Sequence, residues 1–261
     1  MLLTDRFVYV HQPKTGGTFA TDSIRRLYGK RRAADGSPAL KEFEKHAPCS
    51  EIPASHRGLP VLSTFRSPWS RYVSQYHFAW WKQQLPPAVD REALKREYPS
   101  FPEISFAEYV ALTNRFLRPM GEQPPLRDGP LGLQSTQFVK FFFTDPKASW
   151  GTLTDAALED GSFLRGLHPV RFLRQERLNA DLAAALAELG FSPAELAFIG
   201  EAGTILPHAP RTAKRPDRPW REFWTADLVA EVRRRERLLW KVFPDLEEDP
   251  RVPARGSAAP R

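Results

Sequence analysis

The chain has 261 residues and a formal net charge of +7, and a chain of this length can form one ordinary α/β domain. Its one cysteine, Cys49, excludes an intrachain disulfide, and no apolar run approaches the length of a membrane span. The basic charge favours an anionic partner, but no nucleic-acid-binding spacing accompanies it, so we expect no nucleic acid and no membrane span. We expect one domain over residues 1–249 and a disordered tail over residues 250–261.

The first predicted elements are a strand over residues 6–11, a glycine-rich turn and a helix over residues 17–28. The turn reads Pro-Lys-Thr-Gly-Gly-Thr and ends at Thr18. Glycine lets the backbone approach an anion closely, and the first turn of a helix offers N–H groups and the positive end of a dipole. Lys14 adds a cation. The segment predicts a site for an anionic group, against the alternative of a turn that binds nothing.

The order of the residues in this turn argues against two common nucleotide-binding loops. A P-loop NTPase places its lysine after the last glycine, whereas Lys14 precedes both glycines, and no Gly-x-Gly-x-x-Gly fingerprint is present. The turn instead resembles the 5′-phosphosulfate loop of sulfotransferases that use 3′-phosphoadenosine 5′-phosphosulfate (PAPS). This resemblance implies that the loop binds PAPS and that its lysine is also catalytic; the residues concerned are Lys14, Thr15, Gly16, Gly17 and Thr18.

The segment after the first helix offers a catalytic base. His46 begins His-Ala-Pro-Cys-Ser-Glu-Ile, which resembles a His-Ala-x-x-x-Glu-Ile segment in the branch of the family that acts mostly on carbohydrates. The resemblance implies that His46 accepts the proton of the acceptor hydroxyl, and the near-neutral pKa of an imidazole suits that role. A surface histidine without a function is the alternative interpretation. His56 is the weaker candidate for the base in the same stretch.

A second strand, over residues 60–65, is followed by Arg66, and Pro68 suits the first turn of a helix that runs to about Lys82. Ser67 can cap this helix. Ser74 follows Arg66 by eight residues. Because the ends of parallel strands share one edge of a sheet, we expect this segment to lie beside the first loop.

The second segment resembles the 3′-phosphate motif of the same sulfotransferases. The resemblance implies that Arg66 and Ser74 bind the 3′-phosphate, since a guanidinium and a hydroxyl can converge on one oxyanion. Arg71 matches the intervening arginine of the motif, and a solvated helix residue is an equal alternative for it. The motif departs from the family at Ser67, where an acidic or amide residue is usual, and the first loop departs at Gln12, which replaces an aliphatic residue.

The rest of the chain predicts a third core strand within residues 168–176 and three helices, over residues 105–117, 177–189 and 226–242. Ser105 and Glu108 predict a capping box. The proline-dense loops within residues 83–130 either shape the acceptor pocket or decorate the surface.

Several later residues match family positions less specifically. The resemblance makes Gln134 and Thr136 candidates for substrate or cofactor contacts. It places Glu176 at the ligand-binding edge of the sheet, where we favour a structural role. Arg211 is a candidate for the phosphates of the nucleotide, with Lys214 as a second candidate in the same basic loop.

We therefore expect an α/β fold, a P-loop-NTPase-like three-layer sandwich with a central, mainly parallel sheet flanked by helices. The expected activity is transfer of the sulfuryl group of PAPS to a hydroxyl, on a saccharide first and on a small alcohol or phenol second, with no metal. A nucleotide- or polyanion-binding protein without catalysis is the alternative of another class. No signal peptide is evident, which favours the cytoplasm, and the sequence does not indicate an oligomeric state.

Overall fold

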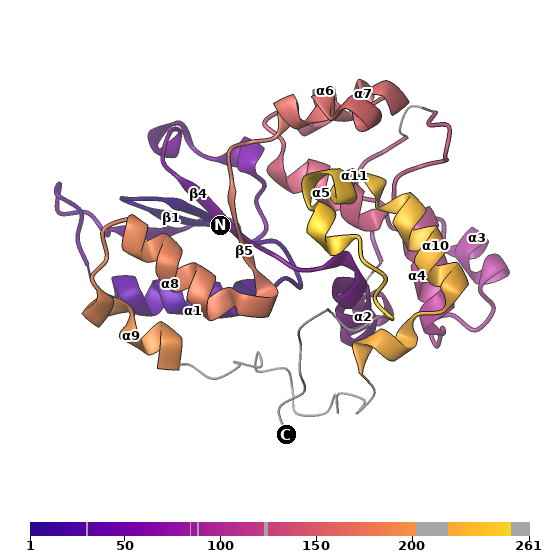
Figure 1. Cartoon of the computed structure of the whole chain (residues 1–261), viewed down its shortest axis with the longest axis horizontal. Helices are drawn as coiled ribbons and strands as arrows, with labels where there is room; N and C mark the ends of the chain where they lie inside the picture. Colours follow the sequence, from indigo (N-terminus) through magenta and orange to yellow (C-terminus); the bar gives the residue numbers. More distant parts are fainter. Residues whose placement is uncertain (30, 84, 88, 123–124, 202–218, 252–261) are drawn as a thin grey trace. The chain divides into compact units, whose positions relative to one another are not determined.

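The structure, a computed structural model, describes residues 1–29, 31–83, 85–87, 89–122, 125–201 and 219–251. It divides into two compact units (Figure 1). The first consists of Met1–Arg66, Phe141–Pro146 and Leu167–Lys214, and the second of Ser67–Lys140, Lys147–Gly166 and Arg215–Arg261. The expected single domain over residues 1–249 stays a prediction. The expected disordered tail falls almost wholly on residues 252–261, outside the described residues.

The first unit contains a five-stranded mixed sheet in the order β3-β1-β2-β4-β5. The strands are β1 (Leu2–Thr4), β2 (Val8–Val10), β3 (Leu40–Glu42), β4 (Val61–Phe65) and β5 (Arg171–Arg174). The pairs β2–β4 and β4–β5 are parallel, whereas β1 runs antiparallel to both β2 and β3. The α/β class is confirmed, and the expected parallel arrangement holds for the three strands that were predicted from the sequence.

Helices α1 (Gly17–Tyr28), α8 (Leu178–Glu188) and α9 (Pro193–Glu201) cover one face of this sheet (Figure 1). Alternation along the second strand turns Phe7 and Tyr9 toward that face, where they pack with Ile24 of α1 and Leu182 of α8. Phe172 of β5 contacts Phe65 and Phe142 edge-on, with ring centroids 6.0 and 4.9 Å apart. The motif-bearing strands therefore lie in the core of the first unit.

The second unit is helical. Its elements are α2 (Pro68–Phe78), α3 (Arg91–Glu97), α4 (Phe106–Phe116), α5 (Leu133–Phe142, whose last two residues belong to the first unit), α6 (Pro146–Gly151), α7 (Asp155–Asp160), α10 (Ala226–Arg235) and α11 (Arg237–Val242). The predicted capping box of α4 is confirmed, because Ser105 Oγ accepts from the Glu108 N–H and the Glu108 carboxylate accepts from the Ser105 N–H. The helix predicted to reach Lys82 ends at Phe78, since Ala79 adopts left-handed backbone angles (φ 49°) and a 3-10 turn follows.

The prediction of one continuous helix over residues 226–242 is wrong, because the helix breaks at Glu236. Glu236 is fully buried, and its carboxylate accepts hydrogen bonds from the Tyr72 hydroxyl (2.5 Å), the Gln134 and Ser135 N–H groups and the Ser135 hydroxyl. Burial raises the pKa of this carboxyl, and the four donors counteract the rise by favouring its ionised form. Because the helix breaks at Glu236, its carboxylate can accept hydrogen bonds from the N–H groups in the first turn of α5.

We expect Glu236→Gln to lower the free energy of unfolding by about 2–4 kcal/mol, because an amide NH₂ cannot accept from these buried donors. Urea denaturation followed by circular dichroism measures the change. Glu103→Gln is the matched control in the same unit, since Glu103 forms an exposed ion pair with Lys82 and such pairs contribute about 0–1 kcal/mol. Equal losses in the two variants would contradict a structural role for the buried acid.

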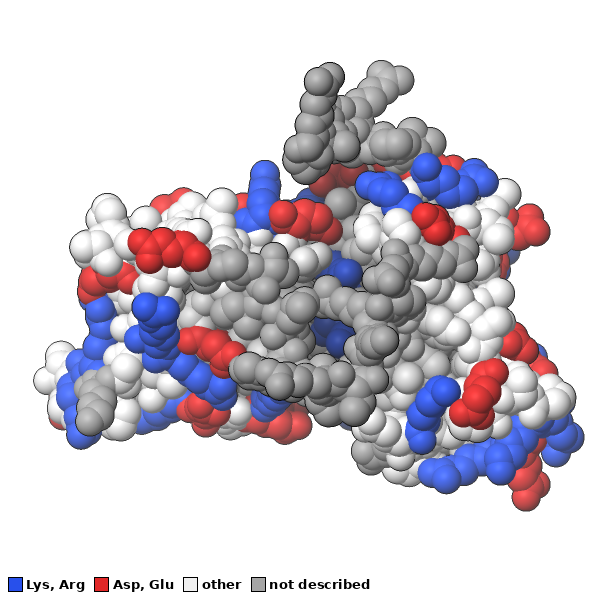
Figure 2. All heavy atoms as spheres, turned by 90° about the horizontal axis from the view of Figure 1, so that it is seen from below, with Lys and Arg blue, Asp and Glu red and all other residues white. Residues whose placement is uncertain are grey.

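Among the described residues of the face drawn in Figure 2, basic and acidic side chains are interspersed. Among the residues that the structure describes, no helix combines the length and the apolarity needed to cross a bilayer.

Candidate functional site

The glycine-rich loop leaves the end of β2 and is held at its base by buried hydroxyl groups. The Thr15 hydroxyl donates to the Gln12 carbonyl (2.8 Å) and contacts the Thr64 hydroxyl (2.7 Å), which in turn contacts the Tyr9 hydroxyl (3.2 Å). Thr15 is fully buried, so its side chain fixes the loop against β4 from the inside. Lys14 is half-buried and Thr18 is exposed, so both side chains lie nearer the surface than that of Thr15.

Two residues of the loop adopt left-handed backbone angles. Lys14 has a φ of 64°, and Gly16, the N-cap residue of α1, has a φ of 94°. A lysine in the left-handed region costs of order 1–2 kcal/mol relative to its usual conformations. Positive φ at residues 14 and 16, with Thr15 between them, is a pattern that turns successive N–H groups toward one side, as in anion-binding nests.

The N-terminus of α1 has no side-chain cap. Gly16 offers no capping oxygen, no side chain caps the helix, and no acidic residue lies in its first turn. The first N–H groups of a helix need acceptors, and the dipole makes an anion a favourable one. The start of this 12-residue helix, with Gly16 as its N-cap, therefore has the features that favour a bound anion.

The two glycines are needed for different reasons. A Cβ on Gly16 would lie 2.8 Å from Leu178 Cδ2, at the start of α8, and would also be strained by the positive φ. A Cβ on Gly17 would lie 2.5 Å from both Cδ2 and Nε2 of His11. The imidazole of His11 therefore occupies the space that any side chain at residue 17 would need.

We expect Gly17→Ala to lower the free energy of unfolding by about 1–3 kcal/mol, because the added methyl overlaps a ring that is itself held by Thr21. Gly200→Ala is the matched control on α9 of the same unit: nothing lies within 4 Å of its new Cβ, and alanine favours a helix. Thermal denaturation of both variants measures the difference. A Gly17→Ala protein as stable as the Gly200→Ala protein would show that His11 moves away without cost.

His11 connects the loop to His46. The His46 Nδ1 lies 3.0 Å from the His11 carbonyl oxygen, and the two rings pack edge-on with centroids 5.1 Å apart. A carbonyl only accepts hydrogen bonds, so Nδ1 of His46 carries the proton and Nε2 of the neutral ring keeps its lone pair. His46 is exposed, so this lone pair can reach an acceptor molecule.

Burial is the main cause that lowers the pKa of both histidines. The pKa of His11, which is buried and contacts the Thr21 hydroxyl through Nδ1, falls to about 3, so its ring stays neutral. His46 is exposed as a whole residue, but its ring packs against His11, and this partial burial lowers its pKa against the opposing effect of its hydrogen bond to the His11 carbonyl. His46 is therefore a neutral imidazole near pH 7, which is the form that can accept a proton.

The other residues predicted for the first unit lie as follows. Arg66 follows β4 directly. Because β2 and β4 are parallel, with Val10 paired to Ser63, Arg66 and the loop after β2 lie at the same edge of the sheet, as expected. Glu176 is exposed in the 3-10 turn Gln175–Arg177 after β5. His56 is half-buried in the 3-10 turn Ala54–His56, and its Nδ1 contacts the Ser55 hydroxyl (2.9 Å).

Three predicted residues lie in the second unit. Ser74 is half-buried on α2. Gln134 and Thr136 are buried on α5 and donate to the carbonyls of Pro68 and Gly132 respectively, so these hydrogen bonds serve the packing of that unit.

Three further expectations concern α2 and the late basic loop. The interpretation of Arg71 as a solvated helix residue is wrong: it is 1% exposed and donates to Gln137 Oε1 at 2.7 Å. Pro68 is confirmed in the first turn of α2, but the side chain of Ser67 makes no capping hydrogen bond there, which corrects the expected cap. Arg211 and Lys214 lie outside the described residues.

Sequence reasoning missed two residues of this site, His11 and Gln12. Gln12 is fully buried just before the loop, and neither polar atom of its amide has a hydrogen-bond partner in the part of the chain that the structure describes. Buried polar groups need a partner, and a bound ligand is one source of it. The departure of Gln12 from the usual aliphatic residue was the sequence signal; His11 gave none, because its role depends on contacts with residues 17 and 46.

Comparison with known proteins gives a distant likeness among solved structures. No protein-family model matches the chain, and no curated protein matches it. Among solved structures it is similar to mouse sulfotransferase SULT7A1 complexed with PAP, with a TM-score of 0.43 and 14% sequence identity over 87% of this chain and 81% of that one. The functional argument therefore depends on the residues of the site.

Proposed function

We propose that this protein is a sulfotransferase that moves the sulfuryl group of PAPS to a hydroxyl of an acceptor, on a saccharide in the first place. The proposal depends on one observation: His11 contacts two features of the site. The first is the start of α1, which follows Lys14 and has no side-chain cap, and the second is His46, whose Nε2 can accept a proton. A helix start of this kind binds a phosphate, and a neutral imidazole removes the proton of a hydroxyl. The sequence motifs after β2 and β4 supply the identity of the donor.

The loop suits the 5′-phosphosulfate end of such a donor. It offers backbone N–H groups, a cation at residue 14 and no carboxylate in the first turn of α1 that would repel an anion. We assign Lys14, Gly16, Gly17 and Thr18 to this end of the donor. Thr15 belongs to the same cofactor-binding loop, in which its hydroxyl holds the backbone in place.

The 3′-phosphate is assigned to Arg66 and Ser74, with Arg211 as a further contact. Arg66 leaves the sheet at the edge that also carries the loop, which supports this assignment. A guanidinium binds a phosphate through two parallel hydrogen bonds, and a hydroxyl adds a third donor. These residues act on cofactor affinity more than on the chemical step.

PAPS supplies an activated sulfuryl group, whose sulfur forms a bond to the acceptor oxygen as its bond to the 5′-phosphate oxygen breaks. His46 Nε2 takes the proton of the acceptor hydroxyl, while its Nδ1–H stays on the His11 carbonyl. Lys14 and the N–H groups at the start of α1 stabilise the negative charge that develops on the phosphate oxygen. These groups are held by the fold before reaction, which is the condition for effective electrostatic stabilisation.

The direct test is titration calorimetry with adenosine 3′,5′-bisphosphate (PAP), followed by transfer of radiolabelled sulfate from PAPS to a panel of saccharides and small alcohols. We expect PAP to bind without added metal and a saccharide to become labelled. Binding without transfer to any acceptor would favour a nucleotide-binding protein. Hydrolysis of ATP with magnesium would favour an NTPase, and labelling of phenols alone would assign the protein to small alcohols.

The pH dependence of the transfer reaction follows from His46. Its folded-state pKa lies below the ordinary value of 6.5, so the neutral, reactive form persists to a lower pH than for a solvated histidine. We expect kcat/KM to be flat around pH 7 and to fall only as the pH drops through that lowered pKa. A pH–rate profile with an acidic limb centred well above pH 6.5 would contradict this assignment.

A further inference from the structure

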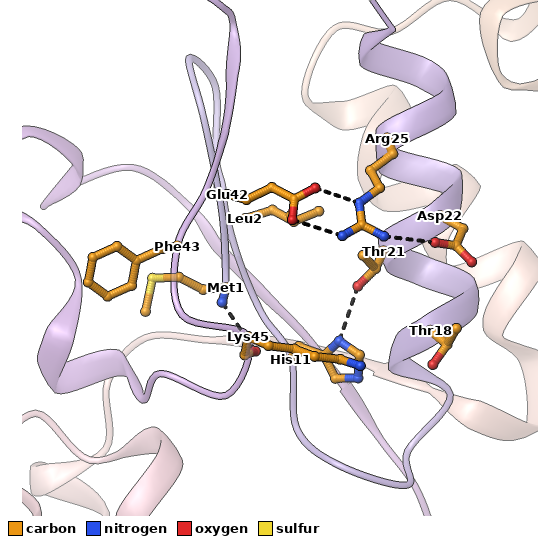
Figure 3. A pocket seen from close by; sticks show the side chains of 10 residues that line it. All are labelled: Met1, Leu2, His11, Thr18, Thr21, Asp22, Arg25, Glu42, Phe43 and Lys45. Carbon is orange, nitrogen blue, oxygen red and sulfur yellow. Dashed lines mark hydrogen bonds and ion pairs between the residues drawn. The ribbon is translucent and has the colours of Figure 1, made fainter. Parts of the chain in front are cut away.

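The first unit contains a cavity of about 140 Å³ between α1 and the strands β1 and β3 (Figure 3). For comparison, one water molecule in the liquid takes up roughly 30 Å³. Thr18, Asp22 and Arg25 line it from α1, whereas Glu42 and Phe43 line it from the end of β3. The cavity therefore has room for a small organic group, such as one ring of a larger molecule.

The cavity adjoins the proposed reaction centre through His11. The His11 ring lines the cavity, as Figure 3 shows, and the same residue holds His46 by its carbonyl and fills the space beside Gly17. Two other lining residues are sequence neighbours of the site: Lys45 precedes His46, and Thr18 follows Gly17. A molecule in the cavity thus lies beside His11, the residue that contacts both the start of α1 and the His46 ring.

A fixed polar wall forms one side of the cavity. The Arg25 guanidinium donates to both oxygens of Glu42 (2.8 and 2.9 Å) and to Asp22 (3.1 Å), as Figure 3 shows. All three side chains remain about half exposed, so their remaining lone pairs and N–H groups are available to a ligand. Glu42 stays ionised, because its hydrogen bond with Arg25 lowers its pKa.

The charges of the lining side chains balance. Arg25 and Lys45 are opposed by Asp22 and Glu42, and His11 is neutral. A carboxylate that already accepts from a guanidinium accepts further hydrogen bonds from hydroxyl groups, whereas it repels another anion. The wall therefore suits an uncharged molecule with several hydroxyl groups.

Phe43 adds an apolar surface. Its side chain is 42% exposed, although large hydrophobic residues are usually covered. A saccharide has C–H groups on the faces of its ring and hydroxyl groups around the edge. Figure 3 shows the Phe43 ring on the other side of the cavity from the Arg25–Glu42–Asp22 wall, so a molecule of more than one ring is needed to contact both. A saccharide of that length offers C–H faces to Phe43 and hydroxyl groups to the wall, whereas a phenol or a fatty alcohol would leave the charged wall without partners.

We infer that this cavity is the acceptor subsite, and that it takes an uncharged saccharide whose ring packs on Phe43 and whose hydroxyl groups bond the Arg25–Glu42–Asp22 wall. The inference rests on the proposed function and specifies its acceptor. Phe43 and Glu42 are then the residues that select the acceptor, and neither takes part in binding the donor.

Saturation-transfer NMR tests this with cellobiose, lactose and N,N′-diacetylchitobiose as neutral probes and a hyaluronan tetrasaccharide as the anionic probe, each with and without PAP. We expect at least one neutral disaccharide to bind. Its affinity should fall at least about fivefold in Phe43→Ala and in Glu42→Gln, the effect of losing roughly 1 kcal/mol of contact. Phe78→Ala and Glu51→Gln, which change exposed residues outside the cavity, should leave it unchanged.

The outcomes separate the inference from the proposed function. Failure of PAP to bind overturns the proposed function, and the measurements without PAP still decide whether the cavity takes a neutral saccharide. If PAP binds but no neutral probe does, or the anionic probe binds more tightly, the inferred subsite is wrong. Undiminished binding in both Phe43→Ala and Glu42→Gln also overturns it.

Discussion

Replacing His46 with asparagine should lower kcat for sulfuryl transfer by about 10²–10⁴-fold, the usual contribution of a general base. The asparagine amide can still donate to the His11 carbonyl, so the local packing is largely kept, but it has no nitrogen lone pair to take a proton. The affinity for PAP should stay within about twofold of the original, because the base does not touch the nucleotide in this assignment.

His56→Asn is the matched control for the base. It removes the second candidate histidine of the same stretch, whose Nδ1 contacts the hydroxyl of the neighbouring Ser55. Single-turnover measurements with saturating PAPS compare the two variants. A collapse of turnover in His56→Asn with near-normal turnover in His46→Asn would reassign the base to His56.

Replacing Lys14 should separate catalysis from stability. Lys14→Gly removes the cation and should lower kcat by about 10²–10³-fold, the range seen when one preorganised donor to a developing anion is lost. The same change relieves the positive φ of residue 14, so the free energy of unfolding should stay equal or rise by about 1 kcal/mol. Steady-state kinetics and thermal denaturation of one preparation measure both.

Two further variants define the role of Lys14. Lys14→Ala keeps the unfavourable backbone and should lose activity similarly without the gain in stability. Lys41→Ala on β3 removes the same charge elsewhere in the first unit and should leave kcat unchanged. A large rise in KM for PAPS with kcat intact, the pattern expected of Arg66→Ala, would show that Lys14 only binds the donor.

Several elements could be predicted because local patterns determine them. The strand, turn and helix around Lys14 follow from apolar alternation and glycine placement, and α1 spans the predicted residues 17–28. The capping box of α4 follows from two side chains three residues apart. The strands β1 and β3 were not predicted, because each has three residues and neither leads into a recognisable motif. β2 is equally short but was predicted from the apolar run before the glycine-rich turn.

The candidate site could be predicted only in part. The sequence identifies Lys14, the glycines and His46 by their order, but it cannot say why Gly17 must be glycine or how His46 is oriented. Both depend on His11, which lies three residues before Lys14 and is brought against residues 17 and 46 by the fold. The break at Glu236 has the same origin, since its hydrogen-bond donors come from residues about a hundred and more positions away.

The sequence alone determined the chemistry that this chain has available: a cation and glycines before a helix, an arginine after a parallel strand, and a histidine between them. Only the tertiary structure decided which nitrogen of His46 is left to accept a proton, and which cavity lies beside His11. The physical reason is that residue type and local spacing act through nearby backbone, whereas a tautomer and a cavity are set by groups that meet only when the sheet forms.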